Sequence, residues 1–317
     1  MRVGINPVKN EFTKLNVGEV RLIIPFFMRM NSPYFKDSKR IFFKCIESII
    51  RNSKGIDLKI SVILNTYDIS LINELYRFDL DRLIMNKSNQ GKVFSCINEA
   101  KSSKEEFIGI IDSDVYFRSG WFEEARNIFN ISNNIGVVSL CPQPNLAFYN
   151  NNSFYGSLLI SKMKFDSLVK REELELFELG VGNSNLYKGS IDWENNQLGI
   201  SRGSTIAIVG AGHFASIYRG EVFNEIDTNG VEYVFRNADE NAFLDKPIDK
   251  KGYFRFSTKE AFVYHMGNTF ETKIKGFEDK VYLKTSTTSY PIIANHHSSY
   301  LIGKLISKIV KLILKSK

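Results

Sequence analysis

The sequence predicts an α/β protein in which a mixed, mostly parallel β-sheet is flanked by helices. Short apolar runs alternate along the chain with amphipathic stretches of helical length. One run, Phe107–Ile111, is apolar throughout and ends abruptly in Asp112 and Asp114. A short run that is apolar on both faces is typical of a buried parallel strand. Strands that alternate with helices in this way indicate a parallel, doubly wound arrangement.

The expected elements follow one another from residue 20 onward. Ser38 is a suitable N-cap for the first helix, whose apolar residues recur on one face. Strands are expected at residues 20–24 (ended by Pro25), 58–64, 82–85, 107–111, 135–140 and 205–209. Helices are expected at residues 38–52, 69–76, 92–102 and 121–130.

The middle of the chain, residues 142–203, has no clear sheet pattern and is expected to form a long excursion. It contains a turn-rich segment, a charged helical run at 162–179 and a Gly-, Asn- and Ser-rich stretch at 180–203. Long irregular regions inside a compact domain usually have a function. We therefore expect the excursion to shape a substrate pocket or an oligomer contact.

Composition places the chain among folded globular proteins. It has 317 residues, 43% of them hydrophobic, with 25 Phe and 14 Tyr, which argues against disorder. The three cysteines are widely spaced and form no CxxC pair, so neither a disulfide framework nor a zinc site is expected. The first residues lack the apolar core of a signal peptide, and no stretch is apolar enough to span a bilayer. The default expectation is a cytoplasmic protein.

The C-terminal tail carries much of the net charge of +7. Lys304, Lys308, Lys311 and Lys315 follow at steps of four, three and four, so they share one helical face, and apolar residues fill the other. This pattern is typical of a helix lying in an anionic membrane interface. It predicts a peripheral protein on the inner face of the membrane, and no nucleic-acid partner. The alternative is a helix docked on the protein body or on a second subunit with its lysines in water.

Asp112 and Asp114 are candidate metal ligands because ligands gather beyond the carboxyl ends of strands in open α/β sheets. Two hard oxygen donors one residue apart can share Mg²⁺ or Mn²⁺, and such an ion neutralises a diphosphate. The alternative is that Asp-Ser-Asp only turns the chain. The surrounding motifs favour the metal site.

Four features, taken in order, resemble the nucleotide-sugar-dependent glycosyltransferases of the GT-A fold, most closely family 2. Each motif is weak alone, and it is their order and spacing over residues 20–267 that make the resemblance specific. The features are the Asn- and Gly-containing helix start at 88–98, the strand ending in Asp112-x-Asp114 with Ser119-Gly-Trp-Phe122 after it, the Gly-rich segment 210–219, and the acidic pair Asp239-Glu240 followed by a late His265.

The resemblance implies a GT-A domain over residues 1–278, with 142–203 on the acceptor side, and a tail over 279–317. It also implies transfer of a sugar from a nucleoside-diphosphate donor to an acceptor hydroxyl. Together with the membrane interpretation of the tail, it predicts a saccharide or lipid-linked saccharide acceptor in bacterial surface polysaccharide assembly. The cofactor would be Mn²⁺ or Mg²⁺, with Asp112, Asp114 and His265 as ligands. The expected donor-binding residues are Pro25, Asn65, Asn89, Gly91 and Asp112. Gly91 at a helix start lets the backbone approach an anion, and Asp68 is expected to cap the next helix.

An acceptor hydroxyl needs a positioned base, and Glu240 or Asp239 is the candidate. Glu240 aligns with the second acidic position of the family motif. The alternative is that both acidic residues only open a helix, where they suit its positive end. His265 has a structural alternative as well, and His213 either faces the acceptor or packs locally.

Several functional alternatives stay open. The resemblance suggests inversion, but a retaining GT-A enzyme has similar motifs. An inactive, membrane-associated scaffold of the same fold is a second alternative, and a homo-oligomer is a third point left open. A nucleotidyltransferase is disfavoured because residues 24–29 lack a glycine-rich, basic loop after the first strand.

Overall fold

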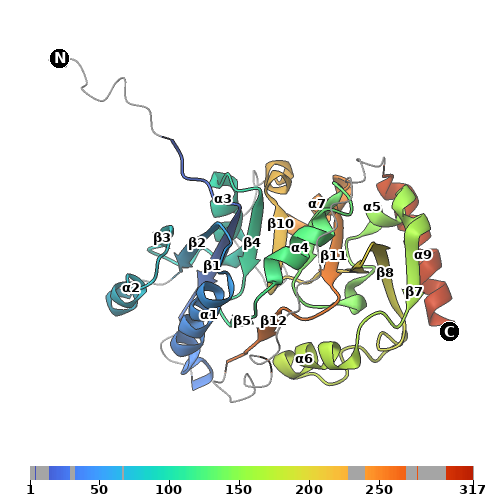
Figure 1. The fold of residues 1–317 in the computed structure, drawn as a ribbon, viewed down its shortest axis with the longest axis horizontal. Coiled ribbons are helices and arrows are strands. Elements are labelled where there is room, and N and C mark those ends of the chain that lie inside the picture. Colours follow the sequence, from blue (N-terminus) through green and yellow to red (C-terminus); the bar gives the residue numbers. More distant parts are fainter. Residues whose placement is uncertain are drawn as a thin grey trace.

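A ten-stranded mixed sheet forms the centre of the protein (Figure 1). The computed structural model describes residues 14–28, 33–65, 68–227, 240–268 and 298–316, with Gly4 and Phe277 as single positions. The strand order is β3-β2-β1-β4-β10-β6-β11-β9-β8-β7. The strands are β1 Val20–Phe26, β2 Leu58–Leu64, β3 Arg82–Met85, β4 Phe107–Ile111, β6 Ile135–Ser139, β7 Met163–Asp166, β8 Gln197–Arg202, β9 Thr205–Val209, β10 Ala215–Arg219 and β11 Phe254–Thr258.

Most strands of this sheet share one direction, which confirms the predicted fold class. Strands β3, β2, β1 and β4 are parallel neighbours, and β6, β11 and β8 run the same way. Strands β10, β9 and β7 run in the opposite direction. Because β10 lies antiparallel between β4 and β6, the simple doubly wound parallel arrangement expected from the alternation of strands and helices is interrupted there.

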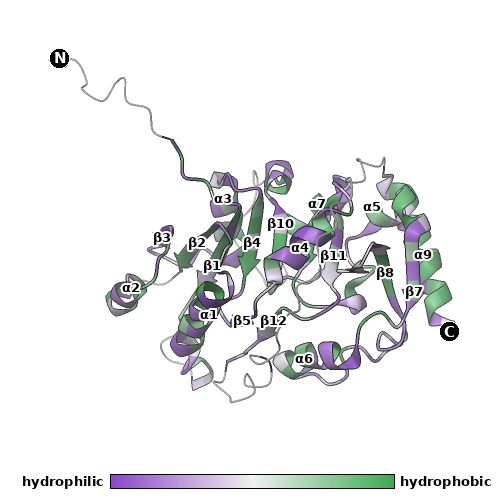
Figure 2. Ribbon diagram, viewed as in Figure 1, coloured by the Kyte–Doolittle hydropathy of each residue, from purple (hydrophilic) through white to green (hydrophobic). Residues whose placement is uncertain are grey.

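Helices cover both faces of the sheet. They are α1 Ser38–Asn52, α2 Ile69–Leu75, α3 Lys92–Ser102, α4 Trp121–Phe129, α5 Asn152–Tyr155, α6 Arg171–Val181, α7 Lys246–Lys250 and α9 Tyr300–Lys315. Buried residues of α1, α2 and α4 join one apolar cluster, and those of α3 and α7 join another. In β1, Leu22 and Ile24 belong to the first cluster while Ile23 belongs to the second, as the alternation of side chains along a strand requires. The central strands are accordingly mainly green in Figure 2.

A separate two-stranded ribbon lies beyond the end of β4. It pairs β5 (Val115–Phe117) with β12 (Val263–His265) in antiparallel register, and His265 is opposite Val115. The ribbon therefore brings residue 265 beside the turn that follows β4.

The excursion at 142–203 is more regular than its sequence predicts. Its last strand, β8, pairs with β9 and carries the edge strand β7 on its other side. The predicted helical run at 162–179 is wrong in its first part, which is β7, and the helix proper is α6. Leu198 and Ile200 of β8 are buried beside the polar Gln197, whose side chain accepts hydrogen bonds from the amides of Leu168 and Val169. A buried polar side chain of this kind interrupts the apolar pattern by which a strand is recognised in a sequence.

The predicted C-terminal helix is present as α9, and it packs against α5 at one end of the sheet (Figure 1). Within the described ranges, no helix combines the length and the hydropathy needed to cross a membrane. The boundary predicted at 278/279 lies among residues that the structure does not describe, so the division into domain and tail stays a prediction.

Candidate active site

The turn after β4 is held in place by backbone hydrogen bonds on both sides. The amide of Asp112 donates to the carbonyl oxygen of Phe214 over 2.7 Å, and the carbonyl oxygen of Asp114 accepts from the amide of Met266, also over 2.7 Å. These bonds tie the turn to the start of β10 and the end of β12. The two carboxylates are therefore fixed at the carboxyl edge of the parallel strands.

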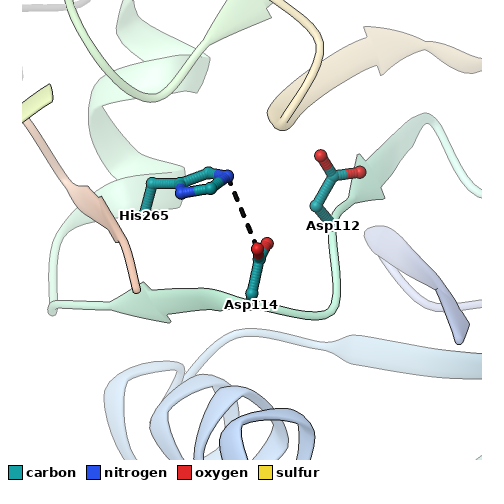
Figure 3. Close-up of side chains that lie close together, drawn as sticks. All are labelled: Asp112, Asp114 and His265. Atoms are coloured by element: carbon teal, nitrogen blue, oxygen red, sulfur yellow. Dashed lines mark ion pairs between the residues drawn. The ribbon is translucent and has the colours of Figure 1, made fainter. Parts of the chain in front are cut away.

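His265 completes a three-residue cluster with the two aspartates. One ligand atom from each of Asp112, Asp114 and His265 lies within 4.8 Å of the others, and the side chains surround a common space (Figure 3). The His265 Nε2 atom is 3.5 Å from an Asp114 carboxylate oxygen. The Nδ1 atom lies 3.3 Å from the carbonyl oxygen of Gly180, at the end of α6. A proton on Nδ1 donated to that carbonyl leaves the Nε2 lone pair directed at the cluster.

Burial makes the cluster electrostatically costly without a cation. Burial raises the pKa of Asp114 to about 6, and the negative charge of Asp112 acts in the same direction, while His265 opposes both. Two carboxylates that share a site disfavour each other's ionised form. A positive charge placed among these three residues relieves that repulsion.

A pocket of about 370 Å³ opens over the two aspartates. Its lining includes six of the residues predicted from the sequence, and Phe26, Phe27, Phe35 and Ile41 give it an apolar side. The six are Pro25, Asn65, Asn89, Gly91, Asp112 and Asp114. The structure therefore brings the expected donor-binding and metal-ligand residues into one cavity, with His265 next to it through Asp114.

Asn65 organises the wall of the pocket rather than presenting a free amide to it. It is buried, and its Oδ1 atom accepts from Asn86 Nδ2 over 2.8 Å, from the amide of Gln90 over 3.2 Å and from Ser95 Oγ over 3.4 Å. Its Nδ2 atom donates to the carbonyl oxygen of Gly91. Asn65 thus joins the end of β2 to the loop before α3.

The start of α3 faces the pocket through a tight turn. Asn89 Oδ1 accepts from the amide of Gly91 over 2.9 Å, and Gly91 has a φ of 73°, a left-handed value that favours glycine. Asp68 is the N-cap of helix α2, and its carboxylate accepts from the amides of Ser70 and Leu71, so the predicted cap is confirmed.

Lys92 is a site residue that the sequence analysis did not single out. Its Nζ atom is 2.5 Å from an Asp112 carboxylate oxygen and 3.4 Å from Glu240 Oε1. Burial alone would lower the pKa of Lys92, but Asp112 and Glu240 outweigh burial and raise it above its ordinary value. Lys92 therefore stays charged and connects one metal-ligand candidate to the candidate base.

The sequence contained one indication of this role, namely the position of Lys92 in the first turn of a predicted helix. A cation there is disfavoured by the helix dipole. A lysine placed there indicates an anionic partner.

Glu240 lies on the far side of Lys92, where a short π-helix, Asn241–Asp245, begins. Burial alone would raise the pKa of Glu240, but Lys92 and backbone hydrogen bonding outweigh burial and lower it below the ordinary value. Its side chain makes no capping hydrogen bond to the helical turn that it precedes. The second candidate, Asp239, lies outside the described residues.

His213 is a partly buried residue, 27% exposed, that lies against a buried ion pair. Its Nε2 atom is 3.2 Å from a carboxylate oxygen of Asp245, which forms a close ion pair with Arg255. Burial and the charge of Arg255 lower the pKa of His213 to about 3, so the ring is neutral and its contact with Asp245 is not an ion pair. Its ring also packs edge-on against Tyr149, as the local-packing alternative expects.

No protein-family model matches this chain, and a search of curated proteins gives no match. Solved structures that resemble this chain include S. aureus TarS and a mannosyltransferase. Residues 1–349 of S. aureus TarS align with 78% of this chain at 14% identity and a TM-score of 0.43. The complex of the same TarS fragment with UDP-GlcNAc aligns with 80% of it, also at 14% identity and a TM-score of 0.43.

A mannosyltransferase, PcManGT from Pyrobaculum calidifontis in complex with GDP-Man and Mn²⁺, aligns with 76% of this chain at 12% identity and a TM-score of 0.39. The aligned part covers 60% and 62% of the two TarS chains and 55% of PcManGT. This chain thus spans less than two thirds of each of these structures. At such identities, and with TM-scores below 0.5, these likenesses carry no conclusion about the activity of this chain.

Proposed function

We propose that this protein is a metal-dependent glycosyltransferase of the GT-A fold that uses a nucleoside-diphosphate sugar. The observation that carries the proposal is the convergence of Asp112, Asp114 and His265, of which the two aspartates line a pocket that also contains the start of α3. Carboxylate oxygens and an imidazole nitrogen suit Mn²⁺, and carboxylates alone suit Mg²⁺. The second nitrogen of His265 is already held by a backbone carbonyl, as metal-binding histidines generally require.

In this proposal Asp112, Asp114 and His265 hold the divalent ion. When bound, the ion supplies positive charge that stabilises the diphosphate leaving group. The protein adds two further sources of positive potential on the same side of the pocket, namely the Lys92 ammonium and the amino end of α3. The apolar side of the pocket and Asn65 then border the nucleoside end of the donor.

Glu240 is the proposed general base toward the acceptor hydroxyl. Lys92 keeps its carboxylate ionised at neutral pH, so it can accept a proton, and Lys92 also fixes its distance from Asp112. Asp239 is the alternative base, as the second acidic residue of the same motif. Inversion is the expected stereochemical outcome because one positioned base suffices for direct displacement, and the retaining alternative requires a different arrangement around the sugar.

We propose a saccharide or a lipid-linked saccharide as the acceptor, in the assembly of bacterial surface polysaccharide. The excursion at 142–203 is the proposed acceptor side, since α6 reaches the cluster through Gly180 and His265. The catalytically inactive scaffold is the competing function.

Calorimetric titration with Mn²⁺ and UDP, and then with Mn²⁺ and GDP, tests the proposal. We expect one nucleotide to bind only when Mn²⁺ is present, and Asp114→Asn to abolish that metal dependence. Asp79→Asn is the matched control, because Asp79 is exposed in the loop between α2 and β3. A screen of donor hydrolysis over several nucleotide sugars then identifies the donor.

Two results would end the proposal. One is wild-type nucleotide affinity in Asp114→Asn with a chelator present. The other is the absence of any metal-dependent nucleotide binding in the wild-type protein. Binding without any donor turnover would favour the inactive scaffold instead.

A further inference from the structure

The outward side of helix α9 is a continuous apolar surface, although the helix is docked on the protein. Leu301, Leu305 and Leu312 are 77%, 62% and 67% exposed. Ile302, Ile309 and Ile313 are also exposed on the same side. We call these six residues the outer face of α9. Large exposed apolar surfaces on soluble proteins mark sites of interaction.

The opposite side of α9 holds the helix to the body through small residues. A side-chain carbon added at Gly303 would lie 1.7 Å from the carbonyl oxygen of Asn152, and one added at Gly156 would lie 2.0 Å from that of Ser299. Ser307 donates to Asn152 Oδ1, and Leu314 is buried. The helix therefore docks on α5 through a face that the sequence analysis did not separate from the apolar one.

The lysines form a third face between these two. Lys304, Lys308, Lys311 and Lys315 are all exposed, and Lys311 also lies 5.8 Å from the ring centre of Phe148. Tyr300–Lys315 contains no acidic residue. In Figure 1 the helix lies at one end of the molecule, away from β4, which leads into the aspartate cluster.

We propose that the outer face of α9 binds the surface of a lipid bilayer that contains anionic lipids, while its inner face stays docked on α5. The docked alternative considered from the sequence is thus correct for the inner face, and the membrane partner concerns the outer one. The apolar side chains of the outer face suit the acyl chains of such a bilayer, and the row of lysines beside them suits its anionic headgroups.

A second copy of this chain is a poorer occupant of the outer face. It would bring the lysines of both helices into one interface that neither helix supplies with a carboxylate. The inference does not depend on the transferase reaction, because no residue of the aspartate cluster takes part in it.

The size of the effect follows from the side chains. Each lysine near an anionic surface contributes favourable free energy to binding, and its neutralisation is expected to lower the vesicle partition coefficient about fivefold. Each outer leucine removed from the acyl layer lowers it by roughly tenfold. High salt weakens the lysine contribution and leaves the leucine contribution.

The test is co-sedimentation of the full-length protein with vesicles. One set contains phosphatidylcholine alone and the other contains phosphatidylglycerol as well. We expect binding to the second set, a loss of roughly a hundredfold for Leu305→Gln with Leu312→Gln, and a graded loss for Lys304→Gln and Lys308→Gln. Ile69→Gln is the matched control, since Ile69 on α2 is 62% exposed, as Leu305 is.

The lysine-to-arginine variants at 304 and 308 keep the charge and are expected to bind as the wild type does. Metal-dependent nucleotide binding, measured on the same samples, shows whether the site is intact, so failure of the membrane inference and failure of the proposed function are distinguishable. Equal binding of the wild type and the variant with both Leu305→Gln and Leu312→Gln would overturn the inference. So would equal binding to vesicles with and without phosphatidylglycerol. So would a dimer in sedimentation equilibrium that the double variant dissociates, because the second copy would then be the occupant.

Discussion

Gly180 provides a way to disturb the proposed metal site without touching a ligand. It lies near the end of α6, and its carbonyl oxygen faces His265 Nδ1. A side-chain carbon added there would lie 2.7 Å from the backbone oxygen of His265 and 2.9 Å from its Cβ. The change Gly180→Ala therefore forces α6 and β12 apart at the point where β12 presents its histidine.

The required displacement can be estimated from these distances. Ordinary contact begins at 3.4 Å, so a contact at 2.7 Å must lengthen by about 0.7 Å. Metal–ligand distances tolerate only about 0.2 Å, so the imidazole can no longer complete the cluster in its present geometry. Changes that act through the support of a ligand typically cost about 10- to 100-fold in metal affinity, and we expect a loss in that range for Mn²⁺.

Mn²⁺ affinity is measured by electron paramagnetic resonance of the free ion, with thermal unfolding recorded in parallel. Alanine in place of glycine inside a helix usually stabilises it by about 1 kcal/mol, so general unfolding is not the expected cause of a weaker site. Gly189→Ala is the control, because an added carbon there has no neighbour within 4 Å. If Gly180→Ala and Gly189→Ala bind Mn²⁺ as tightly as the wild type, α6 does not position His265.

Three further predictions concern stability. Asn65→Ala removes the acceptor of three hydrogen bonds, and urea unfolding should show a loss of about 2 kcal/mol that the exposed control Asn98→Ala does not share. His213 has a lowered pKa of about 3, so it is neutral when folded and gains a proton on unfolding below about pH 6.5.

The free energy of unfolding should therefore decrease as the pH is lowered, by about 2 kcal/mol between about pH 7 and about pH 5. The change His213→Gln should remove this part of the pH dependence. An unchanged pH profile in the variant would contradict the assignment. Gly303→Ala should separate α9 from α5 and lower stability by about 1–3 kcal/mol, and an unchanged melting temperature would show that the contact is not tight.

The sequence predicted the elements whose pattern is local. Helix α1 covers the residues expected from its amphipathic pattern, but the expected cap is wrong, because its N-cap is Asp37 and Ser38 is already the first helical residue. The apolar run at 107–111 is β4, with its carboxylates where the end of a parallel strand places them. The direction of β10 was not predictable, because an apolar strand has the same alternation in either direction. Strand β8 was missed because its buried Gln197 is satisfied by backbone partners that only the fold supplies.

The site divides in the same way. Asp112, Asp114 and Gly91 follow directly from strand and helix boundaries, so their neighbourhood could be expected. His265 joins them only because β12 pairs with β5, and that pairing links residues about 150 positions apart in the chain. Lys92 was missed because its partners, Asp112 and Glu240, come from two other segments.

The docking of α9 has a consequence for how the protein would meet a bilayer. An isolated amphipathic peptide is largely unfolded in water and loses conformational freedom when it becomes helical on lipid. Here the helix is formed and anchored at Gly156 and Gly303 before any contact, so adsorption carries no such penalty. The docking on α5 also prevents rotation of the helix relative to the body of the protein. Every adsorbed molecule would therefore hold its pocket at the same height and tilt above the headgroups.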